Sequence, residues 1–336
     1  MSETPRTKTK PSRNAAGSME LQEGTGPITT MCSCGSFLEI YKQDKTFRVQ
    51  SPESIDPDQT NPDAPWVVSP VADVGSSNQT VARVLLQARE MLDSAMFDED
   101  LDKAAVVLHL HGCKELLLAC ETLATRLSSR IDEIIIKITE HGISRDNHGR
   151  GLNPFPQVDD LELDCGTFLV QINRAIKLVC ELPAIFLQLR KIDSNFDHLS
   201  QSLADVLGET SPILSFVRDN SAGVRYLIEL RNFHEHPKIT KTVVENFRVL
   251  PNGQIQKPSW YLKGQGIAEP RPIGEEVVAI VDFVREITEG MFIHLLMHRI
   301  SKKFPFFIQE IPEDEINSAL PIRYRLSIDI TRMQLT

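Results

Sequence analysis

The feature that most constrains the fold is a long apolar seam that begins at Val106. This seam advances in alternating steps of four and three residues, a spacing that keeps one stripe of a helix against a partner helix. It predicts a single helix of about 40 residues, which is about 60 Å long at 1.5 Å per residue. Such a helix either kinks near Gly112 or projects its end towards a second subunit. The seam consists of Val106, Leu110, Cys113, Leu117, Cys120, Ala124, Leu127, Ile131, Ile134 and Ile138.

Other segments repeat their apolar residues with the same helical period. Pro183 lies inside one of them and is expected to kink or divide that helix, because proline cannot donate the backbone hydrogen bond. The predicted helices, besides the long one, are 78–96, 165–191, 196–207 and 274–301.

The period changes after Pro237. Two strand-like runs, 243–250 and 255–262, flank Asn252 and Gly253, which supply the positive φ angles of a tight turn. This pattern predicts a β-hairpin at about 240–262. Further strand-like runs near the C-terminus are expected to extend the hairpin into a small sheet, and they are 304–311 and 322–330.

Composition bounds the domain organisation. The 336 residues are 41% hydrophobic, which is enough for one substantial core, or for one core plus a small attachment. Residues 1–75 are rich in Ser, Thr, Pro, Asp and Gln and are predicted to form a disordered N-terminal arm. Residues 76–336 are predicted to form a helical bundle with the hairpin and a strand-like C-terminal segment. The fold class expected is mainly α.

Charge and cysteine usage limit the function. The formal net charge of −10 argues against a general nucleic-acid coat, which needs a broad basic field, but leaves local recognition of RNA open. Cys113, Cys120 and Cys180 lie in apolar helical runs and are interpreted as small hydrophobes. No apolar run reaches the roughly 18 residues of a membrane span or forms a signal peptide. We therefore expect a cytoplasmic protein with no membrane contact.

Two further cysteines, Cys32 and Cys34, lie one residue apart in the N-terminal arm. A zinc site of this type normally needs a second cysteine or histidine pair, so the signal for a metal is weak. We expect a solvated, oxidisable pair. No metal site and no cofactor is predicted for the chain.

The stretch from Val224 to Pro237 has a different chemical character. It is an amphipathic helix, for which Ser221 is a plausible start. Arg231 lies at the edge of the apolar stripe, and a cation there must meet water, an anion or a partner. The stripe consists of Val224, Leu227, Ile228, Leu230 and Phe233.

Pro237 determines how this helix ends. Because proline disfavours the α conformation in the residue before it, the helix is expected to stop near Glu235 and to swing His236 out of its regular direction. In an unbroken helix, residues five apart point about 140° away from each other. A helix that stops at the histidine lets Arg231 and His236 face the same cleft. The rim of that cleft is formed by Asn232, His234 and Glu235.

Arg231, Asn232 and His236 resemble the signature of the HEPN family, the higher eukaryotes and prokaryotes nucleotide-binding domain. The signature of this family is an arginine, often followed by a polar residue, with a histidine after four to six intervening residues at the end of a helix. Here four residues separate Arg231 from His236. The resemblance implies an HEPN-like helical bundle.

The resemblance also implies a function, that of a metal-independent endoribonuclease, with a defence or toxin-like role left open. RNA carries its own nucleophile, the 2′-OH, so cleavage to a 2′,3′-cyclic phosphate needs proton transfer and charge neutralisation but no metal. His236 is the expected proton carrier and Arg231 the expected phosphate clamp. Asn232 is expected to orient the histidine or a phosphate oxygen, and His234 to be the second proton carrier. A homodimer would bring two such pairs into one cleft.

Two other functions remain open. The first is a non-catalytic helical module that binds RNA or protein, in which Arg231 and His236 form a solvated helix end with a capping histidine. The acidic composition favours this alternative. The second is a scaffold whose long helix pairs with a partner.

Overall fold

The protein is described here by a computed structural model. It covers residues 13, 18–21, 23–145, 149, 151–189, 194–264, 266–267 and 269–329. The structure is 51% helix and 17% strand, and the strands formed by the described residues make four separate small sheets. The fold class is therefore α+β, and the prediction of a mainly α, HEPN-like bundle is wrong. The apolar period of the helices is visible in the sequence. Most of the strands, whose presence makes the fold class α+β, lie in segments where polar and apolar residues are mixed.

The chain divides into two compact units. Unit 1 contains Met1–Asp93 and Gln309–Arg325, and unit 2 contains Ser94–Ile308 and Leu326–Thr336. The predicted boundary at residue 75 is therefore replaced by one near residue 93, and a segment close to the C-terminus returns to the first unit.

Unit 1 contains a four-stranded antiparallel sheet in the order β1-β2-β3-β4. The strands are β1 (Thr30–Cys34), β2 (Phe37–Tyr41), β3 (Thr46–Gln50) and β4 (Val67–Ala72). The prediction of a disordered arm over residues 1–75 is wrong for this part, and residues 1–12, 14–17 and 22 of the arm lie outside the described residues. An apolar cluster covers one face of the sheet and consists of Leu21, Leu38, Ile40, Phe47, Val49 and Val68.

The other face of this sheet contains buried polar residues, and for this reason its strands were not predicted from the sequence. Glu39 is fully buried and pairs with Arg48 at 3.0 Å. Cys32 and Cys34 are buried as well, so the prediction that they are solvated is wrong. Buried polar residues at alternate positions hide the apolar alternation that normally marks a strand.

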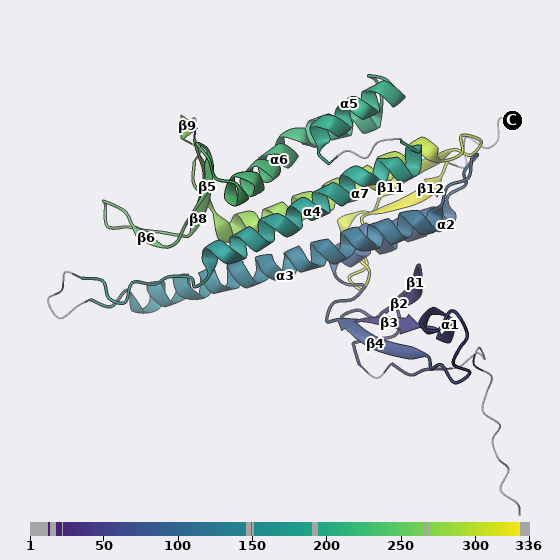
Figure 1. The fold of residues 1–336 in the computed structure, drawn as a ribbon, viewed down its shortest axis with the longest axis horizontal. Helices are drawn as coiled ribbons and strands as arrows, with labels where there is room; N and C mark the ends of the chain where they lie inside the picture. The colour runs from purple at the N-terminus through teal and green to yellow at the C-terminus, as the bar shows by residue number, and fades with distance from the viewer. Residues whose placement is uncertain are drawn as a thin grey trace, which may run out of the picture. The chain divides into compact units, whose positions relative to one another are not determined.

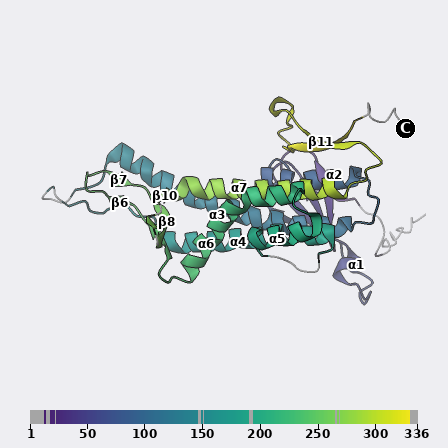
Figure 2. The ribbon, with the colours of Figure 1, turned by 90° about the horizontal axis from the view of Figure 1, so that it is seen from above.

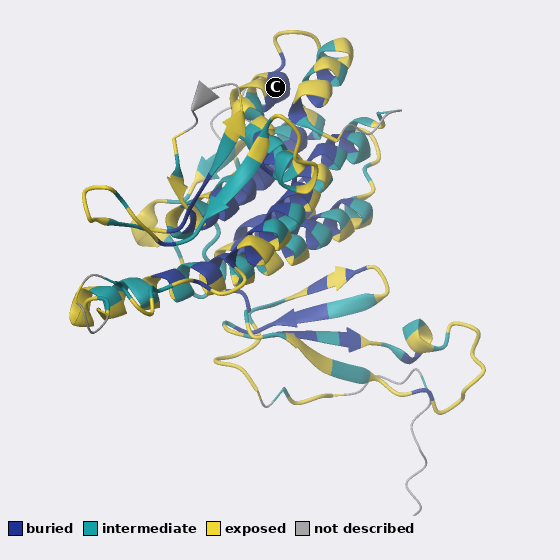
Figure 3. Ribbon diagram, turned by 60° about the vertical axis from the view of Figure 1, so that its left-hand side comes forward, coloured by how far each residue is buried: buried dark blue, intermediate teal, exposed yellow. Residues whose placement is uncertain are grey.

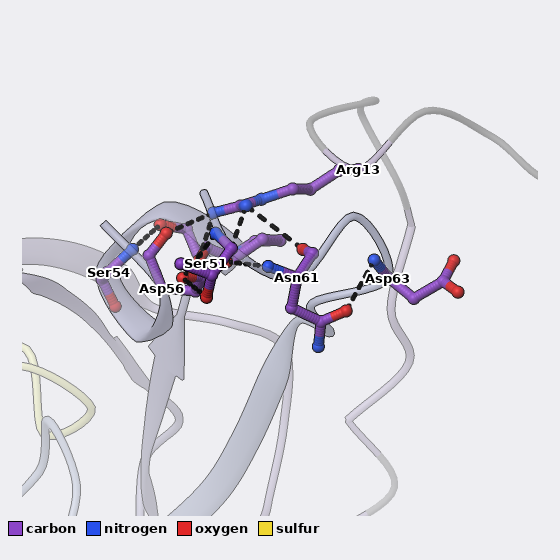
Figure 4. Close-up of polar contacts among 8 residues, drawn as sticks. Arg13, Ser51, Ser54, Asp56, Asn61 and Asp63 are labelled. Atoms are coloured by element: carbon purple, nitrogen blue, oxygen red, sulfur yellow. Dashed lines mark hydrogen bonds and ion pairs between the residues drawn. The ribbon is translucent and has the colours of Figure 1, made fainter. Parts of the chain in front are cut away.

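The connection between β3 and β4 is held by one arginine (Figure 4). The guanidinium of Arg13 donates to Asp56 Oδ2 at 2.8 Å and to the carbonyl oxygens of Pro52 and Asn61. Asp56 also accepts the backbone N–H of Asn61 at 2.8 Å. The short helix α1 (Pro52–Ile55) begins after Ser51, whose hydroxyl accepts the N–H of Ser54. Local polar contacts therefore order this connection.

Unit 1 is completed by a helical segment and by the returning C-terminal segment. The helix predicted at 78–96 is observed as a π-helix, η1 (Val81–Leu86), followed by α2 (Gln87–Ser94). Gln87 Oε1 accepts the backbone N–H groups of Arg323 and Tyr324, both at 2.7 Å. The hydroxyl of Ser76 donates to the carbonyl oxygen of Ala319 at 2.7 Å. These bonds tie together parts of unit 1 that are far apart in sequence.

The strand-like C-terminal runs form a sheet of their own. β11 (Phe306–Glu310) pairs with β12 (Tyr324–Ile328), and the short 3₁₀ helix η2 (Glu313–Glu315) lies between them in sequence. The expectation that these runs extend the hairpin is therefore wrong.

Unit 2 is built on helices (Figure 1). α3 and α4 contact each other and α7, and α6 contacts α4 and α7, while α5 packs on α6 (Figures 1 and 2). Their inner faces carry the buried residues (Figure 3). The bounds are α3 (Lys103–His141), α4 (Leu161–Leu187), α5 (Phe196–Leu207), α6 (Pro212–Glu235) and α7 (Ile273–Arg299).

The long helix α3 is continuous through Gly112. Its N-cap, Asp102, accepts the N–H of Ala105 at 2.9 Å, and the helix ends before Gly142, whose φ is +68°. After Ile131 no residue of this fully described helix is buried. The C-terminal turns of α3 therefore lack the packing that supports the rest of the seam.

Helix α4 continues through Pro183 and ends at Leu187, with Gln188 in the left-handed conformation at φ 52°. The predicted end at residue 191 lies outside the described residues. The predictions of 196–207 and 274–301 as helices are confirmed by α5 and α7. Neither these helices nor any other formed by the described residues is long and apolar enough to cross a membrane.

The predicted β-hairpin is confirmed and lies directly after α6. β5 (Lys241–Glu245) pairs antiparallel with β8 (Ser259–Gly264), and a smaller pair continues towards the turn. At that turn Gly253 has a φ of +82°, whereas Asn252 does not share the predicted positive φ. The remaining short strands are β6 (Arg248–Val249), β7 (Ile255–Gln256), β9 (Gly266–Ile267) and β10 (Arg271–Pro272).

Candidate functional site

The predicted site lies at the C-terminal end of α6, which ends at Glu235 as expected. His236 caps the helix with φ −129° and ψ 63°, and its backbone N–H donates to the carbonyl oxygen of Asn232 at 2.8 Å. This non-helical conformation follows from Pro237, which disfavours the α region in the residue before it. The sequence therefore determines where the helix stops.

The start of α6 differs from the prediction. The helix begins at Pro212, and Ser221 lies inside it. The hydroxyl of Ser221 donates to the carbonyl oxygen of Val217 at 2.8 Å, so the serine is satisfied within the helix instead of capping its start. Pro212 suits the first helical turn, because a backbone N–H at that position would have no partner within the helix and proline therefore loses no hydrogen bond there.

Arg231 is held by residues of its own helix end. Its Nη2 lies 2.6 Å from Glu235 Oε2, and its Nη1 donates to Asn232 Oδ1 at 2.9 Å. Arg231 Nε is buried and has no hydrogen-bond partner in the described part of the chain. The Arg231 side chain is 25% exposed and that of Glu235 29%. The guanidinium therefore remains accessible but already has an anionic partner.

His234 points towards α4. Its imidazole lies against Gly166, where an added Cβ would be 2.6 Å from Cε1 and 3.4 Å from Nε2 of the ring. His234 Nε2 is buried without a hydrogen-bond partner among the described residues. An unpaired buried nitrogen is uncommon in native proteins and costs free energy. The absence of a side chain at Gly166 therefore leaves the space that the His234 ring occupies.

We expect Gly166→Ala to destabilise unit 2 by about 1 to 3 kcal/mol, because the new methyl group overlaps the His234 ring. His234→Ala removes the obstacle. In that background the same glycine replacement should become neutral or stabilising, since alanine favours a helix over glycine by about 1 kcal/mol. Chemical denaturation of the two single variants and the double variant measures the coupling. Additive effects would show that the two residues do not touch.

The four predicted site residues are thus only partly brought together. Arg231 and Asn232 are joined by a hydrogen bond, and His236 is exposed at the end of the same helix. His234 packs on α4 instead of sharing their rim.

The strand that follows the helix stabilises this end of α6. Thr242 Oγ1 on β5 donates to the carbonyl oxygen of Leu230 at 2.7 Å. Leu230 lies inside the helix, so its carbonyl oxygen accepts this bond in addition to the helical one from the N–H four residues later. The chain after Pro237 therefore turns back alongside α6.

Two arginines near this region were missed by sequence analysis. Arg126 Nη2 lies 2.5 Å and Arg130 Nη1 lies 2.7 Å from the two carboxylate oxygens of Asp164 on α4, two residues before Gly166. Because two guanidinium groups share one carboxylate, one positive charge is left over. The Arg126 side chain is half exposed. The spacing of four residues, which places both arginines on one face of α3, was the available signal.

A second polar cluster joins α6 to α7 and β8. Glu276 on α7 accepts hydrogen bonds from the Tyr226 hydroxyl at 3.0 Å and from the Trp260 indole Nε1. Arg271 Nη1 lies 3.0 Å from the same carboxylate, and its guanidinium stacks over the Tyr226 ring. Burial, together with the nearby Glu276 charge, raises the pKa of Tyr226. The cluster fixes α6 against its neighbours.

Unit 2 also contains a cavity of about 270 Å³ between the C-terminal part of α3 and the start of α7. Its lining includes Asp132, Lys257 and Glu275. None of the four predicted site residues lines it, so it does not form part of the predicted site.

Compared with family models, curated proteins and solved structures, the chain matches none of them. The function is therefore inferred from the geometry at the end of α6.

Proposed function

We propose that this protein is a metal-independent endoribonuclease that acts at the C-terminal end of α6. The observation that carries the proposal is the presence of an exposed imidazole and a partly exposed guanidinium on one helix end. His236 has a non-helical conformation and ends the helix, and Arg231 lies five residues, about one and a half turns, earlier. Both groups belong to residue types that act on phosphodiesters.

The chemistry needs two contributions from the protein. In the proposed reaction His236 takes the proton from the 2′-OH of RNA, whose oxygen attacks the adjacent phosphorus. The 5′ oxygen of the next nucleotide then leaves with a proton, which yields a 2′,3′-cyclic phosphate and a 5′-OH end. Arg231 neutralises the charge that develops on the phosphate oxygens. Asn232, bonded to Arg231, keeps the guanidinium at the helix end.

Glu235 competes with RNA for Arg231. An ion pair between partly exposed side chains is worth only about 0 to 1 kcal/mol, so an RNA phosphate can replace the carboxylate. The half-exposed Arg126 on α3 provides a second positive group for the RNA backbone. In this proposal the acidic chain binds RNA at a restricted site, which agrees with its lack of a broad basic field.

The second proton carrier is proposed to come from another copy of the chain. Efficient cleavage uses a base and an acid, and His234 Nε2 is buried against α4. A two-fold axis near the end of α6 places two copies of Arg231 and His236 together. We therefore propose a homodimer in the cytoplasm, the compartment that the sequence predicts.

A non-catalytic interaction module is the second candidate. The observation that favours it is the contact of Arg231 with Glu235 and Asn232, which satisfies much of the guanidinium without any ligand. In that case the motif stabilises the helix end and the protein does not cleave RNA.

The deciding experiment incubates single-stranded RNA with the full chain in excess chelator and assays the products for cyclic phosphate ends. The nuclease proposal expects such ends to accumulate with time. A folded chain that produces no such ends rules the nuclease out. RNA binding without cleavage then leaves the interaction module, and no binding at low salt favours the scaffold.

Replacing Glu235 with glutamine is expected to raise the affinity for RNA by up to about fivefold, because it frees Arg231 from an ion pair worth about 1 kcal/mol. Fluorescence anisotropy with a labelled RNA measures the change. Asp197→Asn is the matched control, since it frees Arg225, which lies earlier on α6 and forms an exposed ion pair with Asp197 at 2.6 Å. An equal gain in both variants would show that only net charge matters.

A further inference from the structure

The cavity between the C-terminal part of α3 and the start of α7 lies apart from the proposed RNA site. Arg126 and Arg130, which pair with Asp164, lie on one face of α3. Ser128 and Asp132 follow them by two residues, about 200° around the helix, and line the cavity. The cavity of about 270 Å³ therefore lies on the face of α3 opposite the two arginines.

Apolar side chains line much of this cavity. Ile131 and Ile135 are four residues apart on α3 and therefore lie on one face of the helix. Ile131 is buried, whereas Ile135 is only partly covered. A hydrocarbon chain placed against them removes apolar surface from water, which favours binding. The apolar lining consists of Ile131, Ile135, Pro258, Pro272 and Val278.

A glycine at the start of α7 leaves part of this space open. A Cβ on Gly274 would lie 3.7 Å from Ile131 Cδ1 and 3.7 Å from Ser128 Oγ. These are ordinary van der Waals distances, so a methyl group at this position fits without displacing its neighbours. Because Gly274 lines the cavity, that methyl group would occupy cavity space and leave the surrounding packing intact.

The charged groups around the cavity leave one carboxylate without a partner. Lys257 Nζ lies 3.1 Å from Glu275 Oε1, so these two charges offset each other. Glu275 also lies in the first turn of α7, where an acidic side chain offsets the positive end of the helix dipole. The Asp132 carboxylate and the Ser128 hydroxyl form no hydrogen bond or ion pair with any described residue. The lining therefore has an excess negative charge, which is located at Asp132.

We propose that this cavity binds a small aliphatic amine. Its ammonium group donates hydrogen bonds to Asp132 and Ser128, whose oxygens are acceptors on one face of α3. Its hydrocarbon chain packs against the isoleucines of α3. The volume lies just below the roughly 300 to 1,000 Å³ of pockets for drug-sized ligands, so a short chain fills it. Carboxylates and RNA phosphates are disfavoured, because Asp132 repels them and Lys257 already pairs with Glu275.

A titration followed by methyl NMR tests the proposal. The full chain is labelled at its isoleucine δ1 methyl groups, and n-butylamine, which is an ammonium ion at neutral pH, is the probe. The signals of Ile131 and Ile135 should shift and saturate. The signal of Ile136, which is 54% exposed on the same helix but does not line the cavity, should not shift. Affinity should rise about three- to fourfold with each methylene group from ethylamine to butylamine.

Two variants test the two parts of the ligand separately. Asp132→Asn should lower the affinity for butylamine by up to about fivefold, the contribution of a partly exposed ion pair. Glu133→Gln makes the same change of charge at the next residue, which is exposed and does not line the cavity, and should have a much smaller effect. Gly274→Ala should lower the affinity by about fourfold or more, because its methyl group displaces a methylene group of the ligand. It should not lower stability, since alanine favours a helix over glycine.

Butyrate and n-butanol, which have chains of similar length but no positive charge, are the control ligands. Equal binding of either control and butylamine would overturn the proposal, as would Ile131 and Ile135 signals that do not saturate with butylamine. Equal effects of Asp132→Asn and Glu133→Gln would also overturn it. The result is independent of RNA cleavage, because no residue of the proposed RNA site lines the cavity.

Discussion

Replacing His236 with alanine is expected to lower the rate of RNA cleavage by about 100- to 10,000-fold, the contribution of a positioned general acid or base. The imidazole is exposed at the residue that caps α6, so its loss should leave packing intact. Initial rates of appearance of cyclic phosphate ends, measured with RNA in excess, provide the comparison. Arg231→Ala should act in the same direction by removing the charge that faces the phosphate.

The control for this change is His141→Ala, because His141 is also an exposed histidine at the C-terminal end of a helix, α3. It should retain the wild-type rate. Circular dichroism should show the same helix content in all variants. Equal rates for the wild type, His141→Ala and His236→Ala would remove His236 from the reaction.

Mixing the Arg231→Ala and His236→Ala chains extends the test to the proposed dimer. If each reaction centre draws residues from two copies, a mixed dimer contains one intact pair and regains part of the lost activity. No recovery after subunit exchange would place the whole reaction within one chain.

Replacing Trp260 with alanine is expected to destabilise unit 2 by about 3 to 5 kcal/mol, the range found for large buried aromatic residues. Trp260 is fully buried on β8, and its ring lies 6.3 Å from that of Phe168 on α4. Its indole N–H also donates a hydrogen bond to Glu276 on α7, so the replacement removes one hydrogen-bond donor from the Glu276 carboxylate. Urea denaturation followed by circular dichroism measures the loss.

Trp66→Ala is the matched control, because Trp66 is 46% exposed. Exposed replacements usually change stability by less than about 0.5 kcal/mol. If Trp260→Ala and Trp66→Ala cost the same, the sheet after α6 does not depend on Trp260 for its attachment to the helices. A large loss for Trp260 alone would show that this residue anchors the sheet.

The helical part of the fold was predictable because its signals are local. α5 has the predicted bounds, and the apolar seam from Val106 lies within the single helix α3. Pro237 fixes the end of α6 through its effect on the residue before it. The start of α6 was missed because Ser221 is a good cap in isolation, while the helix continues through it from Pro212.

The sheet in unit 1 was not predictable from local signals. Its strands are five or six residues long, and their buried face contains Glu39 and Arg48, residues that normally mark an exposed position. The pairing of these two side chains across β2 and β3, together with the hydrogen bond from the Tyr41 hydroxyl to Glu39, offsets the cost of burying the carboxylate. Such a pairing depends on register, which the sequence does not display.

The candidate site was predictable in part. The helix end and the residues on it follow from Pro237 and the apolar stripe, but the ion pair between Glu235 and Arg231 depends on side-chain rotamers. The contact of His234 with Gly166 joins residues of two helices that are distant in sequence. The roles assigned to Arg231, Asn232 and His236 stay predictions until RNA cleavage is measured.

The return of Gln309–Arg325 to unit 1 has a consequence for synthesis on the ribosome. The hydrogen bond from Ser76 to Ala319 spans 243 residues, and Gln87 receives its backbone donors from Arg323 and Tyr324. The strands β1–β4 leave the exit tunnel long before those partners are translated. During that interval the nascent chain exposes an incomplete first unit while the intervening helices emerge and fold.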